Sequence, residues 1–511
     1  MSRQAIADTT IDASFMRPEL TGGRCYVRSG DAVATYDEIA HAAQGFAAWL
    51  VNEGVQPHDR VALWLPNGLA WVVAHVGVSA AGAICVPVST RLTTRETTYI
   101  LRHAEVAAVV TVDEFLGRNY AAQAKEILQA SGVTTSMAVV DGENGRLPSR
   151  SAGQVSRSQP DDPAMLIYTS GTTGVPKGCL LSHRAWTNNA RFSAESAQLT
   201  PSDVVYTASP FFHLFGSLTA LMGSAEVGAS VITDSVFDVD AMLRRIAGDG
   251  VTRLIAVPTV WLDLIAESPH SLGSLEGGLW GGASFPSSAL EKALDSYGLN
   301  LNPVYGMTEA PTVSQGRPDD TRVAKLTTVG SPTPLVEVEI EGEGQDEANV
   351  PGEILVRGYN TMLGYFKDEA ATAARWRDGW FRTGDLGVIR PSGHLVVMGR
   401  ITDMIISGGA NIYAREIENV VLDIPGVAMA AAVAKDDERL GEVPMVWVVR
   451  DRAANLDAKA VIAHCREQLA AYKVPRQVNF IEKLPLTASG KVHKAALREM
   501  ANAKPTAKGA S

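Results

Sequence analysis

The residues best suited to chemistry lie in a segment rich in glycine and hydroxyl side chains that leads to Lys177. Its members are Thr169, Ser170, Gly171, Thr172, Thr173 and Gly174. The glycines let backbone amides approach an anion, the hydroxyls can donate hydrogen bonds, and Lys177 adds positive charge. The pattern differs from a Walker A loop, in which the glycine is followed directly by Lys and then Ser or Thr. It predicts a cradle for a polyphosphate, with a flexible surface turn as the structural alternative.

A cradle of this kind needs rigid support, and the surrounding sequence is typical of an α/β fold. From about residue 33 to 260, short apolar runs alternate with helical patterns. The expected strands are residues 61–65, 83–88, 107–112, 137–140, 164–167, 204–208 and 230–233, and a helix is expected over 70–81. Further strands are expected over 336–340, 352–356 and 394–398. We therefore expect a large α/β domain with a β-rich subsection.

The pattern changes again near residue 400. Helices are expected over residues 414–422 and 457–471, and strands over 427–434, 443–449 and 477–480. This arrangement predicts a small, separate α+β domain.

The composition limits the classes of protein to consider. The 511 residues are 46% hydrophobic and 20% charged, with a formal net charge of −11. Fibrous and disordered classes are excluded, and nucleic acid or an anionic membrane is not expected as the main partner. Residues 61–90 contain no Asp, Glu, Lys or Arg, but Pro66, Gly68 and Gly82 interrupt them. We expect a buried strand-helix-strand unit there and no transmembrane segment.

The cysteines and the first residues both point to the cytoplasm. The four cysteines include no C-x-x-C pair, so neither a zinc site nor a disulfide framework is expected. Residues 1–23 contain charged side chains and no apolar core of signal-peptide length. We expect a cytoplasmic protein.

Further motifs follow the phosphate cradle in a fixed order. They are residues 210–216 (PFFHLFG), 305–309 (YGMTE), 379–385 (GWFRTGD), 399–403 (GRITD) and 486–491 (LTASGK). Together with residues 166–178, they resemble the adenylate-forming enzymes, which include acyl-CoA synthetases, firefly-type luciferases and peptide-synthetase adenylation domains. The resemblance covers nearly the whole chain and is closest in type to acyl- or aryl-CoA ligases.

The resemblance implies two domains and two half-reactions. Residues 1–399 would bind ATP and the acid, and residues 400–511 would form a mobile lid that carries the catalytic lysine. The hinge would lie near residues 400–403, at Asp403. One half-reaction would make an acyl-adenylate, and rotation of the lid would then admit a thiol.

The resemblance also implies roles for individual residues in binding ATP and Mg²⁺. Lys491 would neutralise charge at the α-phosphate with Thr308, while Glu309 and Thr169 would lie near Mg²⁺. The nucleotide would contact residues 169–174, Lys177, Gly282, Ala283, Ser284, Tyr305, Gly306, Met307, Thr308, Asp385, Arg400 and Lys491. Taken singly, these residues have structural alternatives, such as a helix-terminal carboxylate for Glu309 or a solvated loop charge for Lys491.

The carboxylic acid would bind beside the nucleotide. The implied residues are His213, Phe215, Gly216, Val257, Trp261, Gly281, Gly282 and Met307. His213 would also gate the thiol tunnel as a catalytic residue; its structural alternative is an ordinary packed histidine. The bulky, apolar set favours an aromatic, cyclic or medium-chain aliphatic acid. No Arg lies in these segments, which disfavours a dicarboxylate.

The acceptor is expected to be coenzyme A. Residues 210–216 contain no Asp to pair with the amino group of an amino acid, and no carrier domain is expected after residue 511. The alternatives are a stand-alone adenylating enzyme that loads a carrier protein and an inactive nucleotide-binding module. A homodimer is left open.

Overall fold

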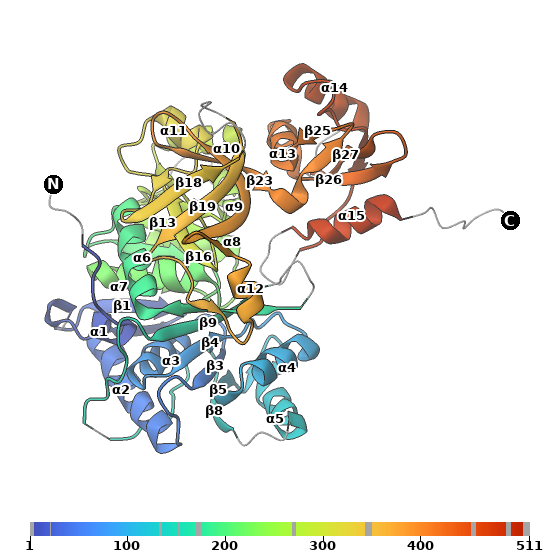
Figure 1. Ribbon diagram of the computed structural model, residues 1–511. Coiled ribbons are helices and arrows are strands. Elements are labelled where there is room, and N and C mark those ends of the chain that lie inside the picture. The colour runs from blue at the N-terminus through green and yellow to red at the C-terminus, as the bar shows by residue number, and fades with distance from the viewer. Residues whose placement is uncertain are drawn as a thin grey trace.

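The structure is a computed structural model that describes residues 5–20, 22–131, 135–151, 153–169, 175–267, 272–342, 350–450, 456–486 and 492–503. It has a large N-terminal α/β domain and a small C-terminal domain, the latter coloured orange to red in Figure 1. Two large sheets, joined by a common apolar core, build most of the N-terminal domain. The α/β fold class expected from the sequence is confirmed.

The first large sheet has the order β20-β10-β9-β4-β3-β5-β8. Its strands are β3 (Arg60–Trp64), β4 (Ile84–Pro87), β5 (Val106–Val112), β8 (Ser136–Val140), β9 (Pro163–Thr169), β10 (Lys177–Ser182) and β20 (Gly364–Tyr365). The preceding and connecting helices are α1 (Ile11–Phe15), η1 (Pro18–Leu20), α2 (Tyr36–Asn52), α3 (Leu69–Ala80), α4 (Thr94–His103) and α5 (Tyr120–Ser131), with a small hairpin of β6 (Glu114–Phe115) and β7 (Arg118–Asn119). Strands β9 and β10 form an antiparallel hairpin around the predicted phosphate cradle.

The second large sheet has the order β17-β16-β15-β14-β13-β11-β12-β1-β2. Its strands are β1 (Cys25–Ser29), β2 (Ala32–Thr35), β11 (Val204–Thr207), β12 (Ser230–Thr233), β13 (Arg253–Ala256), β14 (Gly277–Gly281), β15 (Asn300–Met307), β16 (Ala310–Gln315) and β17 (Ser331–Pro332). The helices are α6 (His183–Ser196), the π-helical η2 (Phe215–Met222), α7 (Gly223–Val227), α8 (Val239–Gly248), α9 (Pro258–Glu267), α10 (Ser287–Asp295) and α11 (Arg322–Thr327). Strands β11, β13, β14 and β15 run parallel as neighbours.

Two smaller sheets complete the chain. The third consists of β18 (Val336–Glu341), β19 (Gly352–Gly358), β21 (Trp376–Arg377), β22 (Trp380–Ile389) and β23 (Leu395–Arg400), beside α12 (Glu369–Ala373). The C-terminal domain contains η3 (Ile401–Asp403), β24 (Ile405–Ser407), β25 (Ala410–Ile412), α13 (Ala414–Leu422), β26 (Val427–Asp437), β27 (Gly441–Arg450), α14 (Ala458–Gln468), β28 (Gln477–Phe480) and α15 (Lys494–Asn502). Its sheet has apolar clusters of its own.

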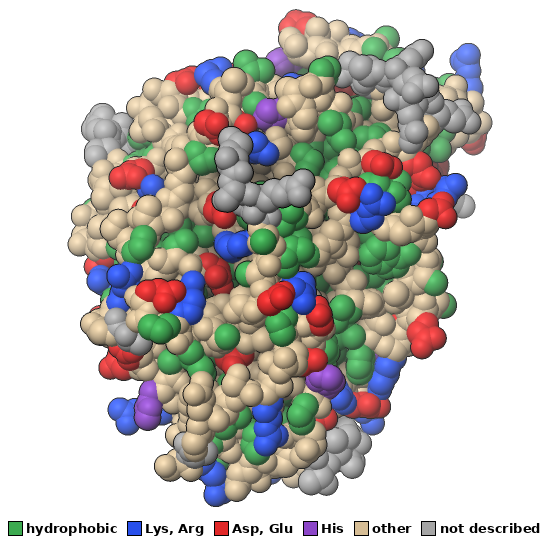
Figure 2. Space-filling view, turned by 60° about the vertical axis from the view of Figure 1, so that its left-hand side comes forward, with side chains coloured by type: hydrophobic (Ala, Val, Ile, Leu, Met, Phe, Trp, Pro, Cys, Tyr) green, Lys and Arg blue, Asp and Glu red, His purple; other side chains and the backbone are tan. Residues whose placement is uncertain are grey.

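The uncharged stretch of residues 61–90 forms β3, α3 and β4, as the sequence predicts. Almost every side chain of α3 is buried, because the helix packs inside the domain against α2. Within the described ranges, no helix is long and apolar enough to cross a membrane. Figure 2 shows acidic and basic side chains interspersed over one face of the molecule.

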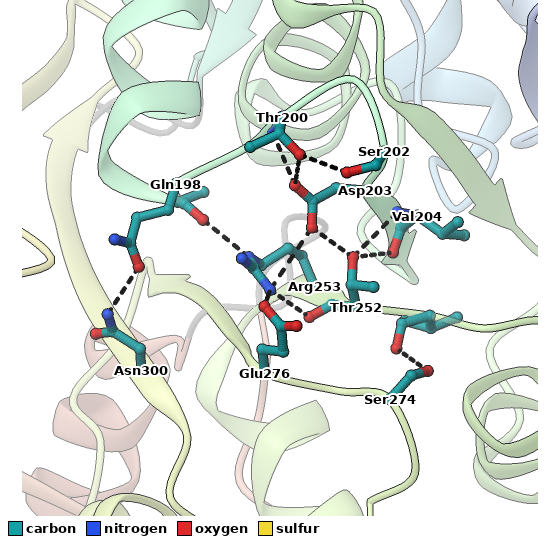
Figure 3. Close-up of polar contacts among 12 residues, drawn as sticks. Gln198, Thr200, Ser202, Asp203, Val204, Thr252, Arg253, Ser274, Glu276 and Asn300 are labelled. Atoms are coloured by element: carbon teal, nitrogen blue, oxygen red, sulfur yellow. Dashed lines mark hydrogen bonds and ion pairs between the residues drawn. The ribbon is translucent and has the colours of Figure 1, made fainter.

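A polar network ties the amino ends of the parallel strands together (Figure 3). Arg253, the first residue of β13, places Nη1 2.5 Å from Oε2 of Glu276 and 3.6 Å from Oδ1 of Asp203. Asp203 and Glu276 directly precede β11 and β14, and the Thr252 hydroxyl donates to Oδ1 of Asp203 at 2.7 Å. The network fixes the strands at this edge, and the opposite edge carries the predicted site.

Candidate active site

The carboxyl ends of four neighbouring parallel strands bring most of the predicted site together. Residues 208–216 follow β11, Val257 follows β13, residues 282–284 follow β14, and Thr308 and Glu309 follow β15. Ligands of open α/β sheets bind outside this edge, because the strand-to-helix connections open there. The topology thus explains why residues almost one hundred positions apart belong to one site.

Tyr305, Asp385 and Arg400 form a hydrogen-bonded group at this edge. The Tyr305 hydroxyl donates to Oδ2 of Asp385 at 2.8 Å, and Nε of Arg400 lies 3.2 Å from Oδ1 of Asp385. Asp385 and Arg400 are direct partners across β22 and β23. Burial, with the nearby Asp385 carboxylate, raises the pKa of the Tyr305 phenol well above its usual range. The phenol therefore remains a neutral donor beside a carboxylate suited to ribose hydroxyls.

Glu309 lies in the turn between β15 and β16 and is firmly held. Its carbonyl accepts from the Met362 amide at 2.8 Å, and its Oε1 accepts from the Tyr365 hydroxyl at 2.8 Å. The Thr308 carbonyl accepts from the Cys179 thiol at 3.5 Å. In the part of the chain that the structure describes, no group of three or more His, Cys, Asp or Glu side chains is arranged for a metal ion. A single carboxylate fits Mg²⁺, which typically takes its other ligands from phosphates and water.

The ends of the phosphate cradle face each other. Thr169 and Lys177 are direct partners across β9 and β10. Nζ of Lys177 lies 3.7 Å from Oδ2 of Asp368 and 5.2 Å from the centre of the Tyr365 ring. The cradle residues Ser170, Gly171, Thr172, Thr173 and Gly174, and the predicted catalytic Lys491, lie outside the described residues.

Several predicted acid-binding residues are neighbours in the structure. A Cβ atom on Gly281 would lie 3.4 Å from the Phe215 ring, and one on Gly282 would lie 3.9 Å from Val257. Gly282 has φ +83°, a conformation that favours glycine. Two further predicted residues, Gly306 and Met307, complete β15, and Ala283 and Ser284 follow Gly282 after β14. The predicted apolar lining is therefore gathered around β14 and β15.

His213 and Trp261 occupy different surroundings. The His213 carbonyl accepts from the Gly216 and Ser217 amides as η2 begins, and its ring lies 4.9 Å from that of Phe212. Trp261 is fully buried in α9, and its indole N–H donates to the Leu279 carbonyl at 3.2 Å. Its indole thus packs within the apolar cluster behind β14.

Asp403 ends the short helix η3 between β23 and β24. Nζ of Lys494 lies 3.6 Å from Oδ2 of Asp403 and 2.7 Å from Oε1 of Glu418. These contacts connect the predicted hinge to α13 and α15.

Sequence reasoning missed Tyr365, Arg375 and Arg415. Tyr365 and Arg375 act electrostatically on each other beside Glu309, and Arg415 from α13 interacts with Asp385. No motif identified them, because Tyr365 joins the site from β20 at the edge of the first sheet, Arg375 from the segment between α12 and β21, and Arg415 from the C-terminal domain.

Comparisons with known proteins match most of the chain. The family described as AMP-binding enzyme matches residues 17–366, and the AMP-binding enzyme C-terminal domain matches residues 416–491. A methyl-dioxo-octahydroindenyl-propanoyl:CoA ligase from Rhodococcus jostii is 36% identical over 93% of this chain and 95% of its own length. A 2-succinylbenzoate–CoA ligase from Bacillus licheniformis is 34% identical over 93% of this chain and 97% of its own.

A solved structure is similar over almost the full length. It is the o-succinylbenzoate CoA synthetase MenE from Bacillus subtilis. Its complex with the acyl-adenylate intermediate OSB-AMP superimposes with a TM-score of 0.82 at 30% identity, covering 96% of this chain and 98% of that one. Its complex with ATP and magnesium ion has a TM-score of 0.83 at 31% identity, covering 96% and 100%.

Proposed function

This chain belongs to the AMP-binding enzymes, and we propose that it is an ATP-dependent carboxylic acid:CoA ligase that works through an acyl-AMP intermediate. The observation that carries this proposal is the Tyr305, Asp385 and Arg400 group at the carboxyl edge of the second sheet, where Glu309 follows the strand that contains Tyr305. The curated relatives reported above are CoA ligases, and the solved relative holds an acyl-adenylate or ATP with magnesium ion.

In the first half-reaction, a carboxylate oxygen of the acid attacks the α-phosphorus of ATP, and the bond to pyrophosphate breaks. Two anions must approach each other, so the site has to neutralise charge as the new bond forms. We assign that role to Lys491 and Thr308, with Asp385 and Arg400 holding the ribose. Glu309 and Thr169 would hold Mg²⁺, which supplies charge compensation for the phosphates.

In the second half-reaction, the thiol of CoA attacks the acyl carbon and AMP leaves. We assign the gate between acid and thiol to His213, at the start of η2. We place the domain boundary at residues 400–403 with Asp403 as the hinge; η3 lies there, between the last strand of one sheet and the first of the next. Rotation about this point would turn one face of the small domain away from the active site and bring another face toward it.

The acid is proposed to be aromatic, cyclic or medium-chain aliphatic. Phe215, Val257, Met307 and the glycines of residues 281–282 supply an apolar wall with little polar surface. The bicyclic propanoyl group in the name of the Rhodococcus jostii relative fits this class. The succinylbenzoate of the Bacillus licheniformis relative is aromatic but carries a second carboxylate, which the acid proposed here lacks.

We also propose that the enzyme works in the cytoplasm. The four cysteines, Cys25, Cys85, Cys179 and Cys465, are unpaired, as in a reducing compartment. A homodimer is retained as an alternative to a monomer, and size-exclusion chromatography with light scattering distinguishes them.

The decisive experiment measures pyrophosphate release over a panel of carboxylic acids, with and without CoA, followed by mass spectrometry of the products. We expect a CoA-dependent thioester from an aromatic or cyclic acid. Adenylate without thioester would reassign the acceptor to a carrier protein, and best turnover of acetate would overturn the acid class.

The Lys491→Ala variant tests the assigned mechanism in the same assay. We expect adenylate formation to slow on the order of 100-fold, because one charge-stabilising donor is lost. Lys459→Ala is the matched control, since Lys459 is exposed on α14. Equal pyrophosphate release by Lys491→Ala and the parent would contradict the role of Lys491.

A further inference from the structure

Tyr365 touches two of the groups assigned to ATP and Mg²⁺, although it belongs to neither motif. We propose that Tyr365 is a positioning residue for the first half-reaction. Its hydroxyl orients the Glu309 carboxylate and its ring places the Lys177 ammonium, so that the metal and phosphates of ATP·Mg²⁺ meet ligands already in position. This inference rests on the proposed function.

The contact with Glu309 is short and shielded. The Tyr365 hydroxyl donates to Oε1 of Glu309 at 2.8 Å, and the two residues are only 7% and 9% exposed. Burial and the Glu309 carboxylate raise the pKa of the Tyr365 phenol, so its oxygen keeps the proton and acts as the donor. The bond engages one carboxylate oxygen and fixes the direction of the other. Hydrogen bonds of this kind orient metal-binding carboxylates in proteins.

The same ring also meets the end of the phosphate cradle. Nζ of Lys177 lies 5.2 Å from the centre of the Tyr365 ring, within reach of a cation–π interaction. Lys177 begins β10 immediately after the cradle, and Asp368 attracts its ammonium from 3.7 Å. One side chain therefore contacts both the carboxylate and the ammonium that ATP·Mg²⁺ would use.

The backbone of Tyr365 is fixed to the strand that carries Lys177. Tyr365 pairs with Cys179 across β20 and β10, and the next amide, of Phe366, donates to the Gly178 carbonyl at 2.7 Å. The Tyr365 amide donates to the Thr372 hydroxyl at 2.9 Å. Because the backbone of Tyr365 is paired with β10, the residue links the strand that carries Lys177 to Glu309.

The test is Tyr365→Phe in the full-length protein, which removes one oxygen and keeps the ring. ATP binding is measured by calorimetry without acid, in excess Mg²⁺ and in EDTA. In the parent we expect Mg²⁺ to tighten ATP binding. In Tyr365→Phe we expect that tightening to fall about 10-fold, with the affinity in EDTA unchanged because Lys177 keeps its aromatic neighbour.

Kinetics supply a second readout. We expect the half-saturating Mg²⁺ concentration for pyrophosphate release to rise about 10-fold, with kcat restored at saturating Mg²⁺. A purely structural loss would lower kcat at every Mg²⁺ concentration. The matched control is Tyr359→Phe, because the buried Tyr359 hydroxyl has no hydrogen-bond partner among the described residues. It should leave both readouts unchanged.

A double-mutant cycle with Glu309→Gln separates the proposed link from independent effects. If Tyr365 acts through Glu309, Tyr365→Phe should add no further loss of Mg²⁺ dependence in the Glu309→Gln background. Additive losses would overturn the proposal. The proposal would also be overturned if Mg²⁺ tightened ATP binding to Tyr365→Phe as strongly as it tightens ATP binding to the parent.

Thr372→Val provides an independent variant if Tyr365→Phe does not fold. It removes the hydroxyl that accepts from the Tyr365 amide, and we expect a smaller loss of Mg²⁺ dependence in the same direction. An unchanged Mg²⁺ dependence would then overturn the proposal. A parent that binds no ATP would overturn the proposed function itself, an outcome distinct from any result for the Tyr365 variant.

Discussion

Gly216 shows how closely the backbone segments approach at the predicted acid pocket. A Cβ atom at this position would lie 2.4 Å from the Pro210 carbonyl oxygen and 2.6 Å from that of Ser209. Both neighbours are backbone atoms, so they cannot move aside as the end of a flexible side chain would. Any side chain at this position would clash with the backbone. The turn that carries His213 therefore requires glycine at residue 216.

We expect Gly216→Ala to lower the free energy of unfolding by about 1 to 3 kcal/mol, the usual cost of overpacking, and to reduce kcat/KM for the acid. Thermal melting and steady-state kinetics measure the two effects. Gly223→Ala, a short distance along the same helical segment, is the control, because its Cβ would lie 3.4 Å from the nearest atom. Equal stability of the two variants would contradict the steric argument.

At this scale, the sequence predicts residues whose type alone suggests a role. A segment of glycines and hydroxyl side chains that leads to a lysine indicates a phosphate cradle. In the structure, Thr169 and Lys177 pair across the two strands at the ends of this segment. Tyr365 could not be predicted in the same way. Its proposed role arises from contacts with Glu309, 56 positions earlier in the chain, and with Lys177, and no local pattern specifies such contacts.

At the scale of the element, α3 buries a histidine inside an apolar helix. His75 is almost fully buried between Trp71 and Trp186, with ring centres 4.9 and 5.9 Å away. Burial, with a smaller effect of the neighbouring His183, lowers the pKa of His75 from 6.5 to about 3. Between these two pH values the unfolded chain binds a proton that the folded chain excludes, so stability falls as the pH falls below about 6.5.

We expect this single group to reduce the free energy of unfolding by about 2 kcal/mol between pH 8 and pH 5. His75→Leu should remove that part of the acid sensitivity, as measured by urea unfolding at the two pH values. His41→Leu, on the exposed side of α2, should leave it in place. An unchanged pH dependence in His75→Leu would contradict the assignment to this histidine.

The extent of elements was harder to predict than their existence. Helix α13 and strands β12 and β28 have the predicted bounds. Strand β26 continues to Asp437, beyond the predicted end at residue 434, because Lys435, Asp436 and Asp437 still pair with β27. The hydrophobic pattern of a sequence indicates which side chains are buried. The length of a hairpin is set instead by how far its backbone groups find hydrogen-bond partners.

At the scale of the whole molecule, the small domain contributes to a helix of the large one. Helix α10 begins after Pro286, which provides no side-chain cap. The Asp423 carboxylate, which directly follows α13, interacts with the Ser287 backbone instead. Arg415, from the same helix, interacts with Asp385 and Tyr305. The small domain is thus held against the large one by contacts at both ends of α13.

We expect Asp423→Ala to weaken this docking by about 1 kcal/mol, the usual value of a helix cap. Energy transfer between dyes on the two domains should then show a larger fraction of undocked molecules. Asp457→Ala is the control, because Asp457 caps α14 within the small domain by accepting from the Ala460 amide at 2.8 Å. Identical transfer efficiencies in Asp423→Ala and the parent would refute the expected effect.

The interaction between Ser287 and Asp423 also offers a way to follow the movement of the small domain. The Ser287 backbone would keep this interaction only while the small domain is docked, so a departure of that domain, as the proposed mechanism requires, would expose the Ser287 amide to solvent. Deuterium uptake at the start of α10 would therefore rise with the fraction of molecules in which the small domain has departed, without any dye or substitution. The proposed movement of the small domain would then be measurable at one peptide of the large domain.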